Sequence, residues 1–160
     1  MKPLSPEQAT RRAEARCAKQ ECCRYDLRMA LLRWGVESED AEQILDHLEK
    51  EGFIDESRYA HAFVHDKVHY DRWGKQKIQA TLRQKKLSDS DIRTALDLVP
   101  ETLYAQNLKA VIEAKIRTIG QDEISNDAYK TFQKLGRHAI SKGYESDMVF
   151  RFLSDRPIEH

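Results

Sequence analysis

The sequence of 160 residues lacks the segments that mark secreted and membrane proteins. Its longest apolar runs, such as residues 29–32, are far shorter than the roughly 20 residues that a membrane-spanning helix requires. The first seven residues have no apolar core, so we expect no secretory signal. Three cysteines, Cys17, Cys22 and Cys23, are an odd number crowded into one stretch, which excludes a disulfide framework and suits a reducing compartment. A cytoplasmic location and no membrane contact are therefore expected.

Proline is also scarce, because only Pro100 of the four lies inside the chain, which leaves residues 7–99 free of helix breakers. Alanine and leucine greatly outnumber valine, as in helical proteins. Net charge is absent as well, since 27 basic residues balance 27 acidic ones. This balance excludes a globally basic nucleic-acid binder but permits a locally basic face. The composition thus predicts a polar, all-α protein.

Helix start and stop signals divide the chain. Ser5 with Gln8 forms a capping-box pattern, and Ser88 offers a similar one. Ser38, Asp55 and Ser125 are further candidate caps. A left-handed glycine after each helix is expected at Gly35, Gly52, Gly74, Gly120 and Gly143. Apolar periodicity between these signals predicts about nine helices, at residues 6–22, 24–34, 38–50, 55–72, 74–85, 89–98, 101–119, 125–141 and 144–153.

The helices repeat in groups of three. Residues 32–45 align without a gap with residues 83–96, and residues 143–153 resemble both segments. We therefore predict three tandem three-helix repeats, over residues 1–52, 53–100 and 101–160, that form an elongated curved array able to lie along a large partner. The alternative is a chance resemblance among amphipathic helices.

Positive charge is concentrated in the middle of the chain. Residues 58–86 carry eight basic and two acidic side chains, interleaved with Tyr59, Tyr70 and Trp73. Cations beside aromatic rings can hold phosphates and unstacked bases. The alternative is a solvated helix face that pairs with the acidic helices of its own fold. The candidate binding residues are Arg58, Lys67, Arg72, Lys75, Lys77, Arg83, Lys85 and Lys86. For Trp34 and Trp73 we favour packing over base stacking.

Signals for an enzyme are missing. The sequence has no Gly-rich phosphate-binding motif, and Gly74-Lys75 is only a fragment of one. His61, His65 and His69 share one helical face and could chelate a metal, but no further ligand at suitable spacing completes a site. We expect no catalytic residue, no metal and no cofactor.

The stretch from Gly52 to Ala60, followed by Phe63, Lys67, Gly74, Lys77, Ile78, Leu82 and Leu87, closely resembles the central signature of the RecX family of recombination regulators. The resemblance covers most of the chain and is most specific over residues 52–92. It departs from the family at Glu56, where an aspartate is common, and at a longer loop around residues 121–123. The resemblance implies the same three-repeat fold and no catalytic activity.

The same resemblance implies binding to the RecA filament, with inhibition or modulation of strand exchange, ATP hydrolysis and co-protease activity. Affinity for DNA is implied as well. Among the positions that match, Asp55 is best explained as a cap, and Tyr59, Phe63, Ile78 and Leu82 as core. This leaves the basic residues as the expected contacts. A stand-alone helical module that binds single-stranded DNA and has no protein target is the alternative. In either case we expect a monomer.

Overall fold

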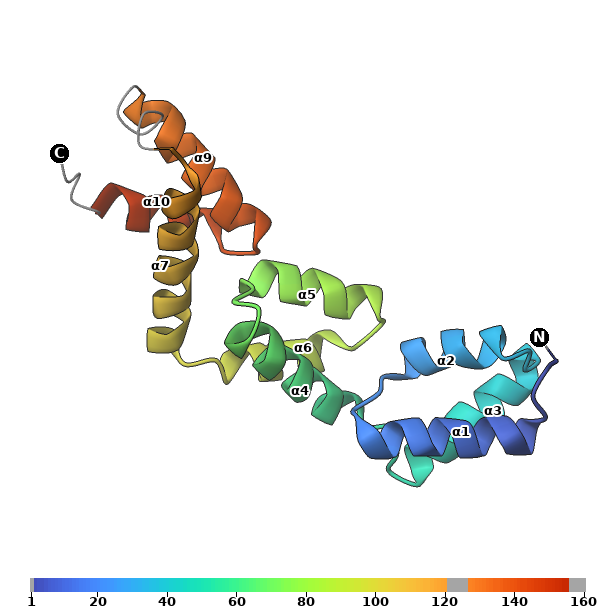
Figure 1. The fold of residues 1–160 in the computed structure, drawn as a ribbon. Helices are drawn as coiled ribbons and strands as arrows, with labels where there is room; N and C mark the ends of the chain where they lie inside the picture. The colour runs from blue at the N-terminus through green and yellow to red at the C-terminus, as the bar shows by residue number, and fades with distance from the viewer. Residues whose placement is uncertain (1, 121–126, 156–160) are drawn as a thin grey trace. The chain divides into compact units, whose positions relative to one another are not determined.

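The computed structural model describes residues 2–120 and 127–155, in which the chain forms nine helices and no strand (Figure 1). The prediction of an all-α fold built from tandem helical repeats is confirmed. No helix in these ranges is long and apolar enough to cross a membrane. The helices are α1 (Pro6–Lys19), α2 (Arg24–Arg33), α3 (Ser38–Lys50), α4 (Glu56–His69), α5 (Lys75–Gln84), α6 (Asp89–Asp97), α7 (Glu101–Thr118), α9 (Ala128–Ser141) and α10 (Ser146–Asp155).

Most of the predicted caps are present. Ser5 and Gln8 form a complete capping box at α1. Asp55 accepts a hydrogen bond from the Arg58 amide at 3.0 Å, and Ser88 accepts one from the Asp91 amide at 3.1 Å. The prediction for Ser38 is wrong, because Glu37 is the N-cap of α3 and forms no side-chain capping bond. Ser125 and the loop around residues 121–123 lie outside the described residues.

The turns differ from the prediction at two helix ends. Gly35, Gly52 and Gly143 have positive φ angles as expected, whereas Gly74 and Gly120 do not. Arg72, between α4 and α5, and Lys86, in the turn after α5, have positive φ angles of 52° and 64° although neither is a glycine. The helix α4 ends at His69, three residues earlier than predicted.

The helix α1 also ends earlier than predicted, at Lys19 rather than at residue 22. The chain then becomes extended, and Cys23 becomes the N-cap of α2. Its Sγ accepts a hydrogen bond from the Asp26 amide at 3.5 Å. A buried cysteine thus caps α2, a helix for which the sequence pattern predicted no N-cap residue.

The chain divides into two compact units. Unit 1 contains residues 1–63 and 82–95, and unit 2 contains residues 64–81 and 96–160. The helices α4, α5 and α6 each contribute residues to both units. The boundaries of the three sequence repeats stay a prediction.

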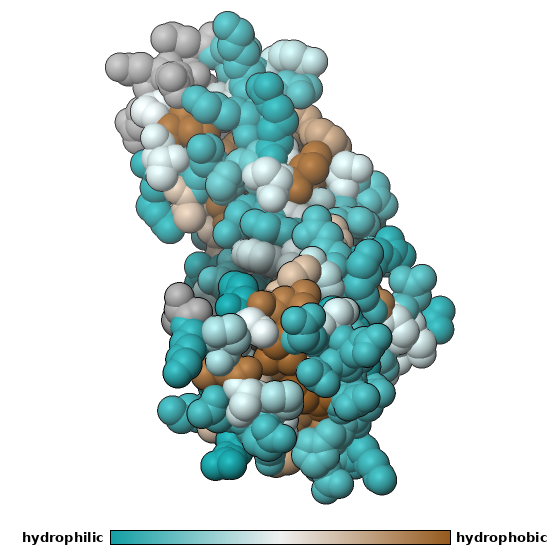
Figure 2. All heavy atoms as spheres, turned by 90° about the vertical axis from the view of Figure 1, so that its right-hand side faces the viewer, coloured by the Kyte–Doolittle hydropathy of each residue, from teal (hydrophilic) through white to brown (hydrophobic). Residues whose placement is uncertain are grey.

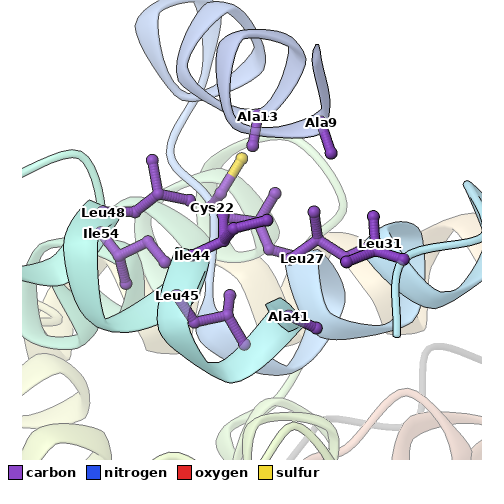
Figure 3. Packing of buried hydrophobic residues seen from close by; sticks show 11 residues of the cluster. Ala9, Ala13, Cys22, Leu27, Leu31, Ala41, Ile44, Leu45, Leu48 and Ile54 are labelled. Atoms are coloured by element: carbon purple, nitrogen blue, oxygen red, sulfur yellow. The ribbon is translucent and has the colours of Figure 1, made fainter. Parts of the chain in front are cut away.

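Unit 1 is built around one apolar cluster, in which α3 packs on α1 and α2 (Figure 3). The small residues Ala9 and Ala13 face this cluster from α1, so that the helix lies close to its neighbours. Leu27 and Leu31 enter from α2, and the α3 residues complete the core. Burial of these aliphatic side chains stabilises the unit by removing apolar surface from water.

Unit 2 has its own core, in which α9 packs on α7 and α10. The rings of Phe132 and Phe150 stack with centroids 5.6 Å apart. Asn107 is the buried polar residue of α7, and its side-chain amide donates to the carbonyl of Val68 at 2.9 Å. This bond satisfies a carbonyl near the end of α4, where the helix can no longer do so.

The surface is largely polar. On the face in Figure 2, hydrophilic side chains predominate and apolar residues reach the surface in patches between them. The exposed large apolar side chains include Tyr70 at 76% and Tyr129 at 70%. Charge rather than apolar area therefore distinguishes one part of the surface from another.

Candidate nucleic-acid interface

The two units divide the eight candidate basic residues equally. Unit 1 holds Arg58, Arg83, Lys85 and Lys86, and unit 2 holds Lys67, Arg72, Lys75 and Lys77. The two groups differ in what their side chains contact.

Arg58 is held by the fold of unit 1. Its guanidinium pairs with Glu21 at 2.6 Å and donates to the carbonyl of Gly52 at 3.0 Å. The bond to Glu21 raises the pKa of Arg58, which is charged in any case. Arg58 therefore joins the start of α4 to the segment that follows α1.

Lys85 is also engaged internally. Its ammonium lies 2.7 Å from the carboxylate of Asp26, and the Tyr59 hydroxyl lies 3.5 Å from the same carboxylate. Burial raises the pKa of Tyr59, which keeps its hydroxyl protonated. Arg83 pairs with Asp89 at 3.2 Å, whereas Lys86 is exposed in the turn after α5. Three of the four unit 1 candidates thus have a carboxylate partner.

Two of the unit 2 candidates lie against one indole ring. The Nζ atoms of Lys67 and Lys77 lie 4.5 and 4.1 Å from the ring centroid of Trp73. The Trp73 amide donates to the carbonyl of Lys67 at 3.0 Å, which folds the residues after α4 back onto the helix. Lys67 also pairs with Asp71 at 3.2 Å. We call Lys67, Arg72, Lys75, Lys77 and Trp73 the Trp73 cluster.

Lys75 reaches a second aromatic ring. Its Nζ lies 5.0 Å from the ring centroid of Tyr104, and its amide donates to the Tyr104 hydroxyl at 3.0 Å. That hydroxyl donates to the carboxylate of Glu145. Burial raises the pKa of Tyr104, so it stays a neutral donor. The start of α5 is in this way fixed by α7 and by the residue before α10.

Residues 142–144, in the turn between α9 and α10, form hydrogen bonds with the segment that carries the Trp73 cluster. The Gly74 amide donates to the carbonyl of Lys142 at 2.8 Å, and the Gln76 amide donates to that of Gly143 at 2.9 Å. The Tyr144 hydroxyl donates to the carbonyl of Arg72 at 2.7 Å. These bonds hold the left-handed Arg72 in place and set the direction in which the basic segment runs.

Lys142 is a further cation that the sequence did not single out. Its Nζ donates to the carbonyl of Asp71 at 3.2 Å, beside the Trp73 cluster. It lies 71 residues further along the chain, and no spacing signal connects the two segments. Only the tertiary structure brings them together.

The histidines are surface residues of α4. The rings of His65 and His69 stack with centroids 4.1 Å apart, and both side chains are exposed. In residues 2–120 and 127–155, no group of three or more His, Cys, Asp or Glu residues is arranged to hold a metal ion. Burial raises the pKa of the Cys17 thiol to about 12 and that of the Cys23 thiol to about 11, which disfavours the thiolate form of both.

The Trp73 cluster combines cationic groups with an aromatic ring. Its ammonium and guanidinium groups can pair with phosphate oxygens. The cation–aromatic contacts hold the lysine side chains in place, which reduces the entropy lost when a ligand binds. Asp71 pairs with Lys67, and Glu145 accepts a hydrogen bond from the hydroxyl of Tyr104, the ring on which Lys75 lies, so the four cations of the cluster outnumber these two carboxylates. The cluster therefore presents net positive charge.

Comparison with known proteins identifies relatives of the chain. Residues 55–96, which include nearly all of α4, α5 and α6, match the family described as "RecX, second three-helix domain". Two crystal structures share the fold. One, described as regulatory protein RecX, has a TM-score of 0.77 at 24% identity and covers 94% of this chain and 74% of that one. The other, RecX from Lactobacillus salivarius, has a TM-score of 0.72 at 18% identity over 93% and 96% of the two chains.

Relatives with curated names point to the same family. Regulatory protein RecX of Clostridium tetani is 32% identical over 114 residues, or 71% of this chain and 51% of the relative. The chain thus spans about half the length of the clostridial relatives that it matches. Regulatory protein RecX of Pseudomonas fluorescens SBW25 is 31% identical over 142 residues, or 89% of this chain and 87% of the relative. Given this identity over nearly the full length of a relative, together with the shared fold, the chain belongs to the RecX family of regulatory proteins.

Proposed function

We propose that this chain binds the RecA filament on single-stranded DNA and inhibits its strand-exchange, ATPase and co-protease activities, and that it thereby regulates DNA repair and recombination. The protein acts in the cytoplasm as a monomer, without a cofactor and without catalysing a reaction. The observation that carries the proposal is the Trp73 cluster, which lies in the segment that matches the family.

Existing ion pairs distinguish the cations that are assigned to the contact from those that are not. Arg58, Arg83 and Lys85 are already paired with carboxylates of unit 1, so binding through them would first cost those ion pairs. The side chains of Arg72, Lys75 and Lys77 have no carboxylate within ion-pair distance in the part of the chain that the structure describes. We therefore assign the main contact to the unit 2 candidates, with Lys86 as an additional exposed cation.

The mechanism follows from binding. A regulator shifts the filament between states only through different affinities for them. Contacts from the Trp73 cluster to phosphates or to an acidic surface of the filament would strengthen one geometry of the filament over the other. The filament would then turn over ATP more slowly, with no catalytic group supplied by this chain.

The test is a titration of this protein into the cognate recombinase, with the DNA-dependent ATPase rate as the readout. Binding to bare single-stranded DNA is measured in parallel at the same salt concentration. We expect the ATPase rate to fall at protein concentrations that leave bare DNA almost unoccupied. If the rate falls only in step with occupancy of free DNA, the chain is a stand-alone DNA-binding module, and the filament proposal is wrong.

A triple variant tests the site. R72A/K75A/K77A removes three cations of the Trp73 cluster, and K109A/K130A/R137A removes three exposed cations from helices α7 and α9 of the same unit. For the first variant we expect the concentration that gives half-maximal inhibition to rise about tenfold or more, because hydrogen bonds to charged groups are lost. The second variant should act like the wild type. Equal losses in both variants would show that only total charge matters.

A further inference from the structure

Unit 1 contains a pocket beside Trp34 that none of the contacts above uses. The N-terminal segment forms one wall, because the Leu4 amide donates to the carbonyl of Trp34 at 2.9 Å. Gly35 permits this approach: its φ angle is +84°, and a Cβ there would lie 2.7 Å from the Cβ of Pro3. The segment is thus held against the turn between α2 and α3.

Three cations line the pocket: Lys2, Arg12 and Arg33. They come from the N-terminal segment, α1 and the last residue of α2. The guanidinium of Arg12 lies over the Trp34 ring, 4.5 Å from its centroid. Trp34 is half-buried and packs against the core of unit 1, so this contact holds Arg12 in a fixed orientation.

The three cations are not neutralised by the fold. Over residues 2–120 and 127–155, no carboxylate lies within 4.0 Å of their charged groups, although ion pairs are common elsewhere in unit 1. Arg24 of the same unit pairs with three carboxylates, from Glu42, Asp46 and Glu49. Like charges around one pocket repel each other, and a bound anion would remove that repulsion.

We infer that the Trp34 pocket, lined by Lys2, Arg12, Arg33 and Trp34, binds a phosphate group, and that a nucleic-acid strand supplies it. A planar guanidinium that is already positioned matches two phosphate oxygens. The partly exposed indole beside it offers an aromatic surface to a neighbouring base. The inference rests on the nucleic-acid part of the proposed function and adds to it a phosphate contact on unit 1.

The sequence supplies a reporter, because Trp34 and Trp73 are the two tryptophans of the chain. In the variant W73F, Trp34 is the sole tryptophan. We expect its emission to change in a saturable, salt-sensitive way when a 20-nucleotide oligo-dT is added. R12A in this background should weaken the response about tenfold. R11A removes the neighbouring charge on α1 but does not line the pocket, so it should respond like its parent.

A second variant distinguishes loss of the pocket from loss of folding. R33A changes an exposed residue at the end of α2 and should also weaken binding, with an unchanged far-UV circular dichroism spectrum. If neither R12A nor R33A differs from R11A, or if Trp34 emission does not respond to oligo-dT, the inference is wrong.

Two further titrations identify the anion. Inorganic phosphate should act only at much higher concentration than oligo-dT; an equal response would keep the phosphate site but overturn a strand as its source. Poly-glutamate that binds as tightly as oligo-dT would overturn the phosphate assignment.

The test is separate from that of the proposed function. W34F leaves Trp73 as the sole reporter for unit 2. A response of Trp34 without any effect on the recombinase would support the pocket and not the filament proposal. The opposite outcome is also distinguishable. If R12A inhibits the filament as strongly as the wild type and Trp34 emission in W73F does not respond to oligo-dT, the filament proposal is supported and the pocket proposal is wrong.

Discussion

The backbones at Gly74 and Gly143 approach each other too closely for a side chain at Gly74. A Cβ on Gly74 would lie 2.0 Å from the carbonyl carbon of Gly143, a distance that no rotamer change can relieve. Gly74 has an ordinary φ angle, so it is required by the close approach of two backbones and not by its own conformation. The helix stop signals in the sequence assigned this glycine to a helix end, which explains its position but not why a larger residue is excluded.

The substitution Gly74→Ala should therefore destabilise the protein by about 3 kcal/mol, at the upper end of overpacking effects. Gly120→Ala is the matched control, since a Cβ at Gly120 would meet nothing within 4 Å. Urea unfolding followed by circular dichroism measures both. A loss in Gly74→Ala no larger than in Gly120→Ala would contradict the close contact.

Lys85 and Lys86 are adjacent but differ in role. Lys85 pairs with the half-buried Asp26, whereas Lys86 is exposed and has no carboxylate within ion-pair distance among the described residues. The variant K85M leaves Asp26 without its cation and should cost about 2 kcal/mol of unfolding free energy. K86M removes the same charge and should change stability little. Thermal unfolding of both variants checks this; equal stabilities would show that the pair with Asp26 contributes nothing.

At the scale of elements, ion pairs join α2 to α3 in unit 1. Glu42 of α3 pairs with Arg28 and Arg24 of α2, at 2.5 and 3.0 Å. The hydrogen bond from Arg28, and then that from Arg24, lowers the pKa of Glu42 from 4.5 to about 2. The acidic α3 and the basic residues of α2 are thus partners within unit 1.

This shift predicts how stability depends on pH. Because the pKa of Glu42 is lower in the folded chain than in the unfolded one, its contribution is complete above about pH 4.5 and is lost as the pH falls toward 2. The side chain is 45% exposed, so solvent screening limits the contribution to about 1 kcal/mol.

Glu42→Gln should accordingly be less stable than the wild type at pH 7 and equally stable near pH 2. Glu14→Gln is the control, because Glu14 has no cation within ion-pair distance among the residues that the structure describes. Urea titrations at a series of pH values measure the difference. A difference that stays constant down to pH 2 would show that Glu42 acts through packing and not through its charge.

For the whole molecule, a net charge of zero hides two local concentrations of positive charge, one in each unit. The overall charge therefore gives no guide to the salt dependence of binding, which follows the groups in contact. For a single strand, each phosphate contact contributes about 0.7 to the slope of log K against log salt.

The four cations of the Trp73 cluster give an expected slope of about −3 when oligo-dT binding is followed by Trp73 emission, and the three cations of the Trp34 pocket give a slope of about −2 when it is followed by Trp34 emission. R12A/R33A should therefore reduce the slope measured by Trp34 emission, while K109A/K130A should not. Fluorescence titrations between 50 and 200 mM salt, about the range over which such effects are measured, give both slopes. A slope that is equal in all three proteins would mean that the Trp34 pocket carries no phosphate.

Much of the fold was accessible from the sequence because it is local. Helix positions follow from apolar periodicity, and the caps at Ser5, Asp55 and Ser88 act on amides three residues away. The family, too, was recognised from a contiguous stretch of residues and is confirmed. Predictions went wrong where a non-glycine residue took the left-handed conformation, as at Arg72, since nothing in its own side chain favours it.

The sequence by itself thus determined the helices, their tandem arrangement and the basic segment that holds the candidate contacts. Only the tertiary structure decided which of these cations are available: Arg58 and Lys85 are paired with carboxylates from distant segments, and Lys77 lies over Trp73. It also brought Lys142 to the Trp73 cluster and Arg12 to Trp34. The physical reason is the sequence separation of the interacting residues. Helix formation depends on neighbours within a turn or two, whereas the availability of a charge depends on which opposite charge the folded chain places beside it.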